Sequence, residues 1–384
     1  MPHLQTAWLE VARKYACLTQ KELSQLAGIS QASLSKIEAG ISLPSRDVVE
    51  TLADAMGVPL GLLHSTVAVL APEHALPRTR KATKKQVDRF WACQNILRLS
   101  VARLLESVEI DADFELPAMK PSRYDGGAAE IAARIRSGWE IPPGPIDDLV
   151  SLIEAAGVLV FRFDFGIDAI DGISHPSRGG LPPMIFLNAR HPGCRQRFTA
   201  AHELGHLVMH RVVDDTAESE ANEFASAFLM PDRDIAASLA PPVRLQKIAL
   251  LKPLWGVSMA ALLRKSRDIG YMSDSQYRRA CIQMRKYGKT EPVPLVPEEP
   301  RMVRDLAKHH LDVLGYSPDE LLEAALVPSR AWEHRSVFGL PDPPKVAKMK
   351  LVATIDPKSS PRRTRRGQLQ LLNSPSSDDC ADGS

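Results

Sequence analysis

Apolar side chains recur at helical spacing through the first 65 residues. The repeating positions are Leu23, Leu26, Ile29, Leu34 and Ile37. Gly28 and Gly40 stand where such helices are expected to end. The pattern predicts short helices separated by tight turns.

A basic, polar stretch follows over residues 77–89 and predicts a linker that leads into a helix near 90–106. No sequence repeat with a period of about 20–50 residues is visible.

Residues 125–235 mix two periods. The predicted helices are 128–139, 146–156, 197–210 and 218–229, the last ended by Pro231. β-rich runs at 158–165 and Met184–Asn188 predict strands. Met184–Asn188 is either an exposed edge strand, able to align an extended peptide, or an ordinary core strand.

These patterns predict a mainly α fold with a small α+β part. A length of 384 residues allows two or three domains. Helices dominate from about 243 to 327, and the end of the chain is rich in Lys, Arg, Ser, Pro and Asp, so disorder is expected there. The expected divisions are 1–65, a linker and helix at 66–124, a mixed domain at 125–235, a helical extension at 236–345, and a disordered tail at 346–384.

Composition narrows the functional classes. The net charge of +2 excludes a protein that coats nucleic acid with its whole body. No apolar run is long enough for a membrane helix, and the N-terminus does not resemble a signal peptide. The five cysteines are scattered and form no CxxC pair. We therefore expect a soluble, cytoplasmic protein without a membrane partner.

The segment 19–40 has the layout of a helix-turn-helix. Thr19 and Glu22 fit a capping box, and Ser30 can cap the second helix beyond Gly28. That helix would enter the major groove of double-stranded DNA. The candidate DNA contacts are Gln31 for adenine, Ala32 for a thymine methyl, Lys36 for guanine or phosphate, and Gln20 for the backbone.

Residues 5–65 resemble the phage-repressor (XRE) class of helix-turn-helix, including SKIEAG after the second helix and the closing LADAMGVPLGLL. The resemblance implies a compact five-helix domain, which would bind a symmetric operator as a homodimer. However, residues 1–65 carry five basic and six acidic side chains. Their net charge of −1 offers little attraction to DNA phosphates. Docking to another protein is the alternative.

An HExxH motif lies at His202, Glu203 and His206. Positions i and i+4 share one face of a helix, so both imidazoles can ligate one Zn²⁺. Glu203 then lies where it can take a proton from the attacking water. The motif predicts a zinc metallopeptidase.

The residues alone leave more than one candidate for the third metal ligand. Glu218 can complete a His₂Glu site, while Asn222, one turn later, orients a ligand imidazole. Alternatively, Glu218 forms a capping box with Asp215, and Glu223 or His210 is the ligand. Glu220 and Glu223 are otherwise expected to face solvent.

Residues 125–232 resemble the ImmA/IrrE family of bacterial zinc peptidases. The resemblance rests on the order and spacing of DGIS, PPMIFLNAR, RFTAAHELGHLVMH and ESEANEFASAFLMP, and it continues into 250–290. It implies a gluzincin-like domain with Glu218 as the third ligand. It also implies limited proteolysis of a repressor protein that controls phage, mobile-element or stress genes.

Two functions compete on this sequence: an active zinc endopeptidase, and a DNA-binding regulator whose zinc site is structural or catalytically lapsed. Glu203 favours the first, because a structural site does not need a base. The candidate oxyanion stabilisers are His175, Tyr124 and His210.

Overall fold

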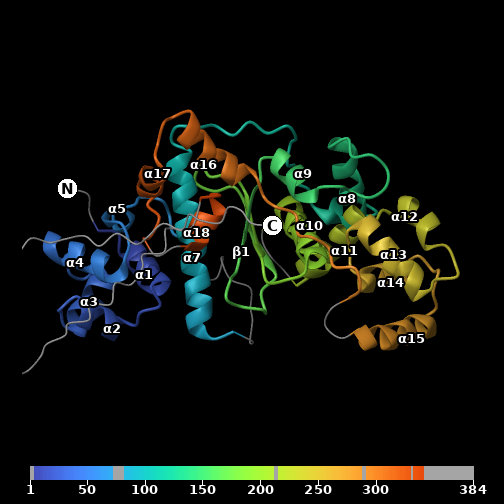
Figure 1. Ribbon diagram of the computed structural model, residues 1–384, viewed down its shortest axis with the longest axis horizontal. Helices are drawn as coiled ribbons and strands as arrows, with labels where there is room; N and C mark the ends of the chain where they lie inside the picture. Colours follow the sequence, from blue (N-terminus) through green and yellow to red (C-terminus); the bar gives the residue numbers. More distant parts are fainter. Residues whose placement is uncertain (1–3, 72–81, 212–214, 288–290, 330–331, 341–384) are drawn as a thin grey trace, which may run out of the picture. The chain divides into compact units, whose positions relative to one another are not determined.

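A computed structural model describes residues 4–71, 82–211, 215–287, 291–329 and 332–340 (Figure 1). It confirms a mainly α protein with a small sheet. The expected disordered tail, 346–384, lies outside the described residues. No helix among those described is long and apolar enough to cross a membrane.

The N-terminal helices follow the predicted punctuation. They are α1 (Thr6–Tyr15), α2 (Gln20–Leu26), α3 (Gln31–Glu38), α4 (Arg46–Met56) and α5 (Leu60–Leu63). Thr19 and Glu22 form the predicted capping box at the start of α2, and the Ser30 side chain caps α3. Gly28 has φ of 66°, a left-handed turn conformation that glycine adopts without strain.

Helix α7 (Lys84–Leu104) begins inside the predicted linker, so the linker prediction is wrong from Lys84 onward. Thr83 and Gln86 form a capping box that starts the helix there. The middle of α7 is buried on every side, because it packs against α1 and the C-terminal helices, and its Phe90 and Gln94 side chains contact the sheet. The Phe90 ring, for example, lies 4.2 Å from that of Phe165.

The sheet has three strands in the order β1 (Leu159–Phe163), β3 (Met184–Asn188), β2 (Gly172–His175). β3 pairs parallel to β1 and antiparallel to β2, and all its residues are buried. The edge-strand interpretation of Met184–Asn188 is therefore wrong, and the core-strand interpretation is confirmed. β2, which the sequence did not reveal, is the edge strand that contacts the HExxH helix.

The two faces of the sheet belong to different cores. Phe161 and Phe186 pack with α7 and with the C-terminal helices α16 (Met302–Asp312), α17 (Pro318–Ala324) and α18 (Trp332–Val337). Val160 and Ile185 face the other core. That core is built by α8 (Gly127–Gly138), α9 (Leu149–Ala155), α10 (Gly193–Met209) and α11 (Ala217–Leu229).

The helical extension does not pack as one layer. Pro231 ends α11 as predicted, but α12 (Asp232–Leu239) begins directly after it. α12, α13 (Leu245–Trp255), α14 (Met259–Asp268) and α15 (Asp274–Met284) complete the second core. α16 and α17 pack against the first core instead.

Candidate metal centre

The HExxH motif lies on α10, which packs closely against α11. Gly205, inside the motif, makes this approach possible: a Cβ atom there would lie 3.0 Å from the Phe224 ring of α11. The close contact brings the first turn of α11 beside the two histidines.

Three ligand atoms converge at this point. The Nε2 atoms of His202 and His206 are 3.1 Å apart. Carboxylate oxygens of Glu218 lie 3.5 Å from His202 Nε2 and 3.6 Å from His206 Nε2. Tetrahedral zinc with bonds of about 2.0–2.1 Å separates its ligand atoms by about 3.3–3.4 Å. These residues therefore fit a zinc ion in number, chemistry and spacing.

The structure distinguishes between the candidate third ligands. α11 begins at Ala217 with Thr216 as its N-cap residue, and the Glu218 carboxylate lies against the histidines, so the capping-box alternative is wrong. Hydrogen bonds from His202 and His206 hold the pKa of Glu218 well below its usual value. Glu223 is exposed and is not part of the three-residue cluster.

His210 lies outside the three-residue cluster and contacts one of its members, His206. Its Nδ1 lies 2.9 Å from His206 Nδ1, and its Nε2 lies 2.9 Å from a carboxylate oxygen of Glu220. A chain of contacts therefore runs from the Glu220 carboxylate through the His210 ring to His206 Nδ1. The other ring nitrogen of His206, Nε2, faces His202 and Glu218. The expectation that Glu220 is merely solvated is wrong.

Glu203 occupies a buried position beside the histidines. Ser174 of β2 donates a hydrogen bond of 2.7 Å to its carboxylate. Burial raises the pKa of Glu203, although the neighbouring histidines oppose the shift. A buried carboxylate with a raised pKa suits a group that must both accept and release a proton.

The contact with Ser174 depends on a close approach of β2 to α10. A Cβ atom at Gly172 would lie 2.6 Å from Thr199 Cγ2 and 2.8 Å from the Phe186 carbonyl oxygen. Only glycine fits there without displacing the strand. Sequence reasoning identified neither Gly172 nor Ser174 as a supporting residue, since both lie on the strand it missed.

Asn222 lies on α11 beside Glu218 and His202. Its side chain hydrogen-bonds His202, and its amide donates to the Glu218 carbonyl at 2.7 Å. Burial disfavours charge on His202, but the hydrogen bond to Glu218 and the nearby Glu203 raise its pKa overall.

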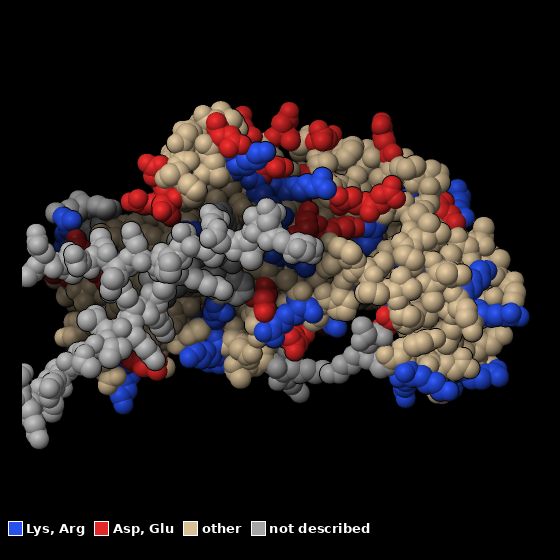
Figure 2. Space-filling view, in the orientation of Figure 1, with Lys and Arg blue, Asp and Glu red and all other residues tan. Residues whose placement is uncertain are grey.

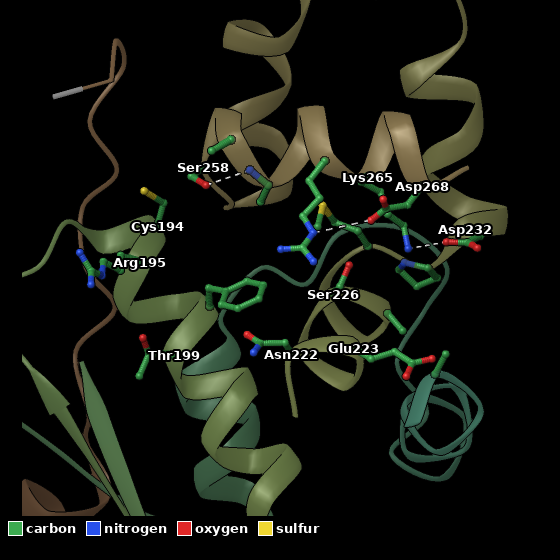
Figure 3. A pocket seen from close by; sticks show the side chains of 18 of the residues that line it. Cys194, Arg195, Thr199, Asn222, Glu223, Ser226, Asp232, Ser258, Lys265 and Asp268 are labelled. Carbon is green, nitrogen blue, oxygen red and sulfur yellow. Dashed lines mark hydrogen bonds and ion pairs between the residues drawn. The ribbon is translucent and has the colours of Figure 1, made fainter. Parts of the chain in front are cut away.

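A cleft of about 1870 Å³ begins one helical turn from these ligands. Figure 3 shows Thr199 of α10 and Asn222 of α11 on its wall, with Lys265 of α14 across from them. Lys265 is ion-paired with Asp232 on that wall.

None of the three oxyanion candidates belongs to the cluster of His202, His206 and Glu218, and each makes contacts of its own. His175 is buried and lies 2.7 Å from the Gln94 side-chain oxygen, and burial lowers its pKa to about 3. The Tyr124 ring stacks under the Arg134 guanidinium at 5.0 Å. His210 is held between His206 and Glu220.

On the N-terminal domain, three of the four candidate DNA contacts are exposed on α3: Gln31, Ala32 and Lys36. The fourth, Gln20, is partly buried, and its amide donates a 2.7 Å hydrogen bond to Glu38. Glu38 also pairs with Arg13 at 2.6 Å, so Gln20 belongs to a network that holds α2 against α1 and α3.

Comparison with known families agrees with both halves of this description. Residues 12–63 match the helix-turn-helix family, and residues 153–267 match a peptidase family described as the IrrE N-terminal-like domain. The chain carries a helix-turn-helix domain and an IrrE N-terminal-like domain. The resemblance to the XRE class and to the ImmA/IrrE family is thereby confirmed. A comparison with curated proteins finds no match.

The match to the IrrE N-terminal-like domain covers the sheet, α10, α11 and α14, and hence every residue of the candidate metal centre. The helix-turn-helix match covers α2 to α5 and supports DNA as a partner.

Proposed function

We propose that the chain is a zinc-dependent endopeptidase that cleaves a protein substrate. The convergence of His202, His206 and Glu218 beside a buried Glu203 carries this proposal. These three residues would hold Zn²⁺, which would supply Lewis-acid polarisation of the scissile carbonyl group. The remaining chemistry belongs to the protein.

Glu203 accepts a proton from the attacking water and later delivers it to the leaving amine nitrogen. The Ser174 hydroxyl holds the carboxylate in position at 2.7 Å. Asn222 and His210 fix the orientations of the two ligand histidines through their hydrogen bonds.

The substrate backbone is expected to bind in an extended form at β2. This strand has β3 on one side and no strand on the other among the described residues, so its outer edge can add a peptide strand. Ser174 lies on the same strand, and peptide bound there would therefore run past Glu203 and the metal ligands.

The substrate is proposed to be a transcriptional repressor, with a role in phage, mobile-element or stress regulation. The same chain carries a helix-turn-helix domain, which would bring the peptidase to DNA-bound proteins or control its own operon. Binding as a homodimer would match a two-fold-symmetric operator.

Metal analysis tests the assignment of ligands. The purified chain should hold about one zinc ion, and His202→Ala or Glu218→Ala should greatly reduce both the zinc content and the cleavage of a repressor protein offered as substrate. Glu223→Ala, one turn along α11, is the matched control and should retain both. If Glu223 is required and Glu218 is dispensable, the ligand assignment is wrong.

A further inference from the structure

Positive charge is concentrated on one short segment. Residues 1–342 carry 40 Lys and Arg against 42 Asp and Glu, but residues 264–286 carry seven basic side chains and only two acidic ones. The segment comprises the end of α14, all of α15 and the turn after it. Figure 2 shows Lys and Arg side chains gathered over α15, at the lower right of the view.

Four of these cations form a stripe on α15 and the turn that follows it. Arg278, Arg279, Arg285 and Lys286, called here the basic stripe, occupy positions i, i+1, i+7 and i+8 and are all exposed. At 3.6 residues per turn they fall within an arc of about 120°. The opposite side of the helix is apolar: Tyr277, Ala280 and Met284 pack against the second core.

The stripe is not neutralised by the protein's own acids. Among the described residues, none of its four cations forms an ion pair with a carboxylate, whereas other exposed arginines do. Arg134, for example, lies 2.7 Å from Glu130, and Arg190 lies 2.5 Å from Asp164. Four adjacent cations without such partners favour a polyanionic ligand.

We propose that the basic stripe binds the phosphate backbone of double-stranded DNA, an inference that rests on the DNA-binding function proposed above. Residues 1–65 carry a net charge of −1, so the helix-turn-helix itself offers little attraction to phosphate. Two turns of α15 extend about 10 Å, over which one DNA strand presents about three phosphates. The stripe supplies the sequence-independent attraction that the helix-turn-helix lacks.

The salt dependence of DNA binding measures this contribution. Each neutralised phosphate contributes about −0.9 to the slope of log Kobs against log salt concentration. Three contacts would therefore contribute about −2.7, and two contacts about −1.8. Replacement of the four cations by glutamine should reduce the slope by an amount in this range and weaken binding to all sequences alike.

The experiment compares two full-length variants on a 20-base-pair duplex of arbitrary sequence. The first is R278Q/R279Q/R285Q/K286Q. The control, R103Q/R134Q/R190Q/R304Q, removes four exposed or partly exposed arginines that are ion-paired with carboxylates, so both variants lose the same charge. Circular dichroism and thermal unfolding confirm that both fold. Poly-glutamate and vesicles containing phosphatidylglycerol are tested in parallel.

The proposal predicts a shallower salt slope for the stripe variant and a nearly wild-type slope for the control. Equal salt slopes in the two variants would overturn the proposal. It would also be overturned if the stripe variant lost binding to poly-glutamate or to the vesicles but bound the duplex as the wild type does. A separate variant, Gln31→Ala on a selected operator, tests the helix-turn-helix. A further pair of results is a loss of sequence preference in Gln31→Ala together with a wild-type salt slope in the stripe variant. That pair of results would support DNA binding by the helix-turn-helix and refute the proposed role of the basic stripe.

Discussion

Replacement of Glu220 by alanine should weaken zinc binding although Glu220 is not a ligand. The substitution removes the carboxylate that lies 2.9 Å from His210 Nε2, and His210 in turn contacts His206 Nδ1 at 2.9 Å. The side chain of His210 is only 6% exposed, so water cannot readily replace the lost partner. Loss of such a supporting partner typically costs about 10–100-fold in metal affinity, or about 1.4–2.7 kcal/mol.

Competition with a chromophoric chelator measures the zinc dissociation constant directly. Glu223→Ala is the control, because Glu223 lies on the same helix and is exposed, with no ion pair among the described residues. With zinc above its dissociation constant, the thermal stabilisation by zinc should fall by the same free energy. Equal zinc affinities for Glu220→Ala and Glu223→Ala would refute the role of the Glu220–His210 pair.

Three further outcomes are expected. Burial raises the pKa of Glu154 from 4.5 to about 7, so the folded state binds this proton more tightly than the unfolded state. The free energy of unfolding should therefore fall by about 3 kcal/mol as the pH rises from 4.5 to 7. In urea unfolding, Glu154→Gln should not show this fall. Gly172→Ala should destabilise the fold by about 1–3 kcal/mol and reduce cleavage, because its Cβ would displace β2; wild-type stability and cleavage would contradict the close approach. Gln31→Ala should lose about 1–3 kcal/mol of discrimination at one base pair in a binding competition, and unchanged discrimination would exclude the base contact.

The sequence predicted those parts of the fold that depend on local patterns. Thr19, Ser30 and Gly28 delimit the first helices because capping and left-handed turns act over a few residues. The HExxH spacing and the i, i+4 pair Glu218 and Asn222 likewise follow from helix geometry, so the three residues that converge could be named in advance as candidate ligands.

The rest of the site depends on contacts between distant segments. Strand β2 is short and only half buried, with Gly172 at its start, so it shows neither a long β-rich run nor a clear alternation. Ser174 reaches Glu203 only because Gly172 lets the strand approach α10. Glu220 looked like a solvated helix residue, since its partner His210 lies at the end of another helix. Lys84 looked like part of a linker because the burial of α7 arises from tertiary packing.

The proposal that Glu203 is the general base of a zinc peptidase is tested most directly by comparing the wild-type chain with Glu203→Gln. Zinc content and cleavage of a repressor protein are measured on the same preparations. The substitution keeps the size of the side chain and its hydrogen bond with Ser174 but removes the proton acceptor. If Glu203 is the general base, the zinc content and thermal stability should be unchanged, and cleavage should fall by about 10²–10⁴-fold. Undiminished cleavage by a folded, zinc-loaded Glu203→Gln protein would contradict the proposal.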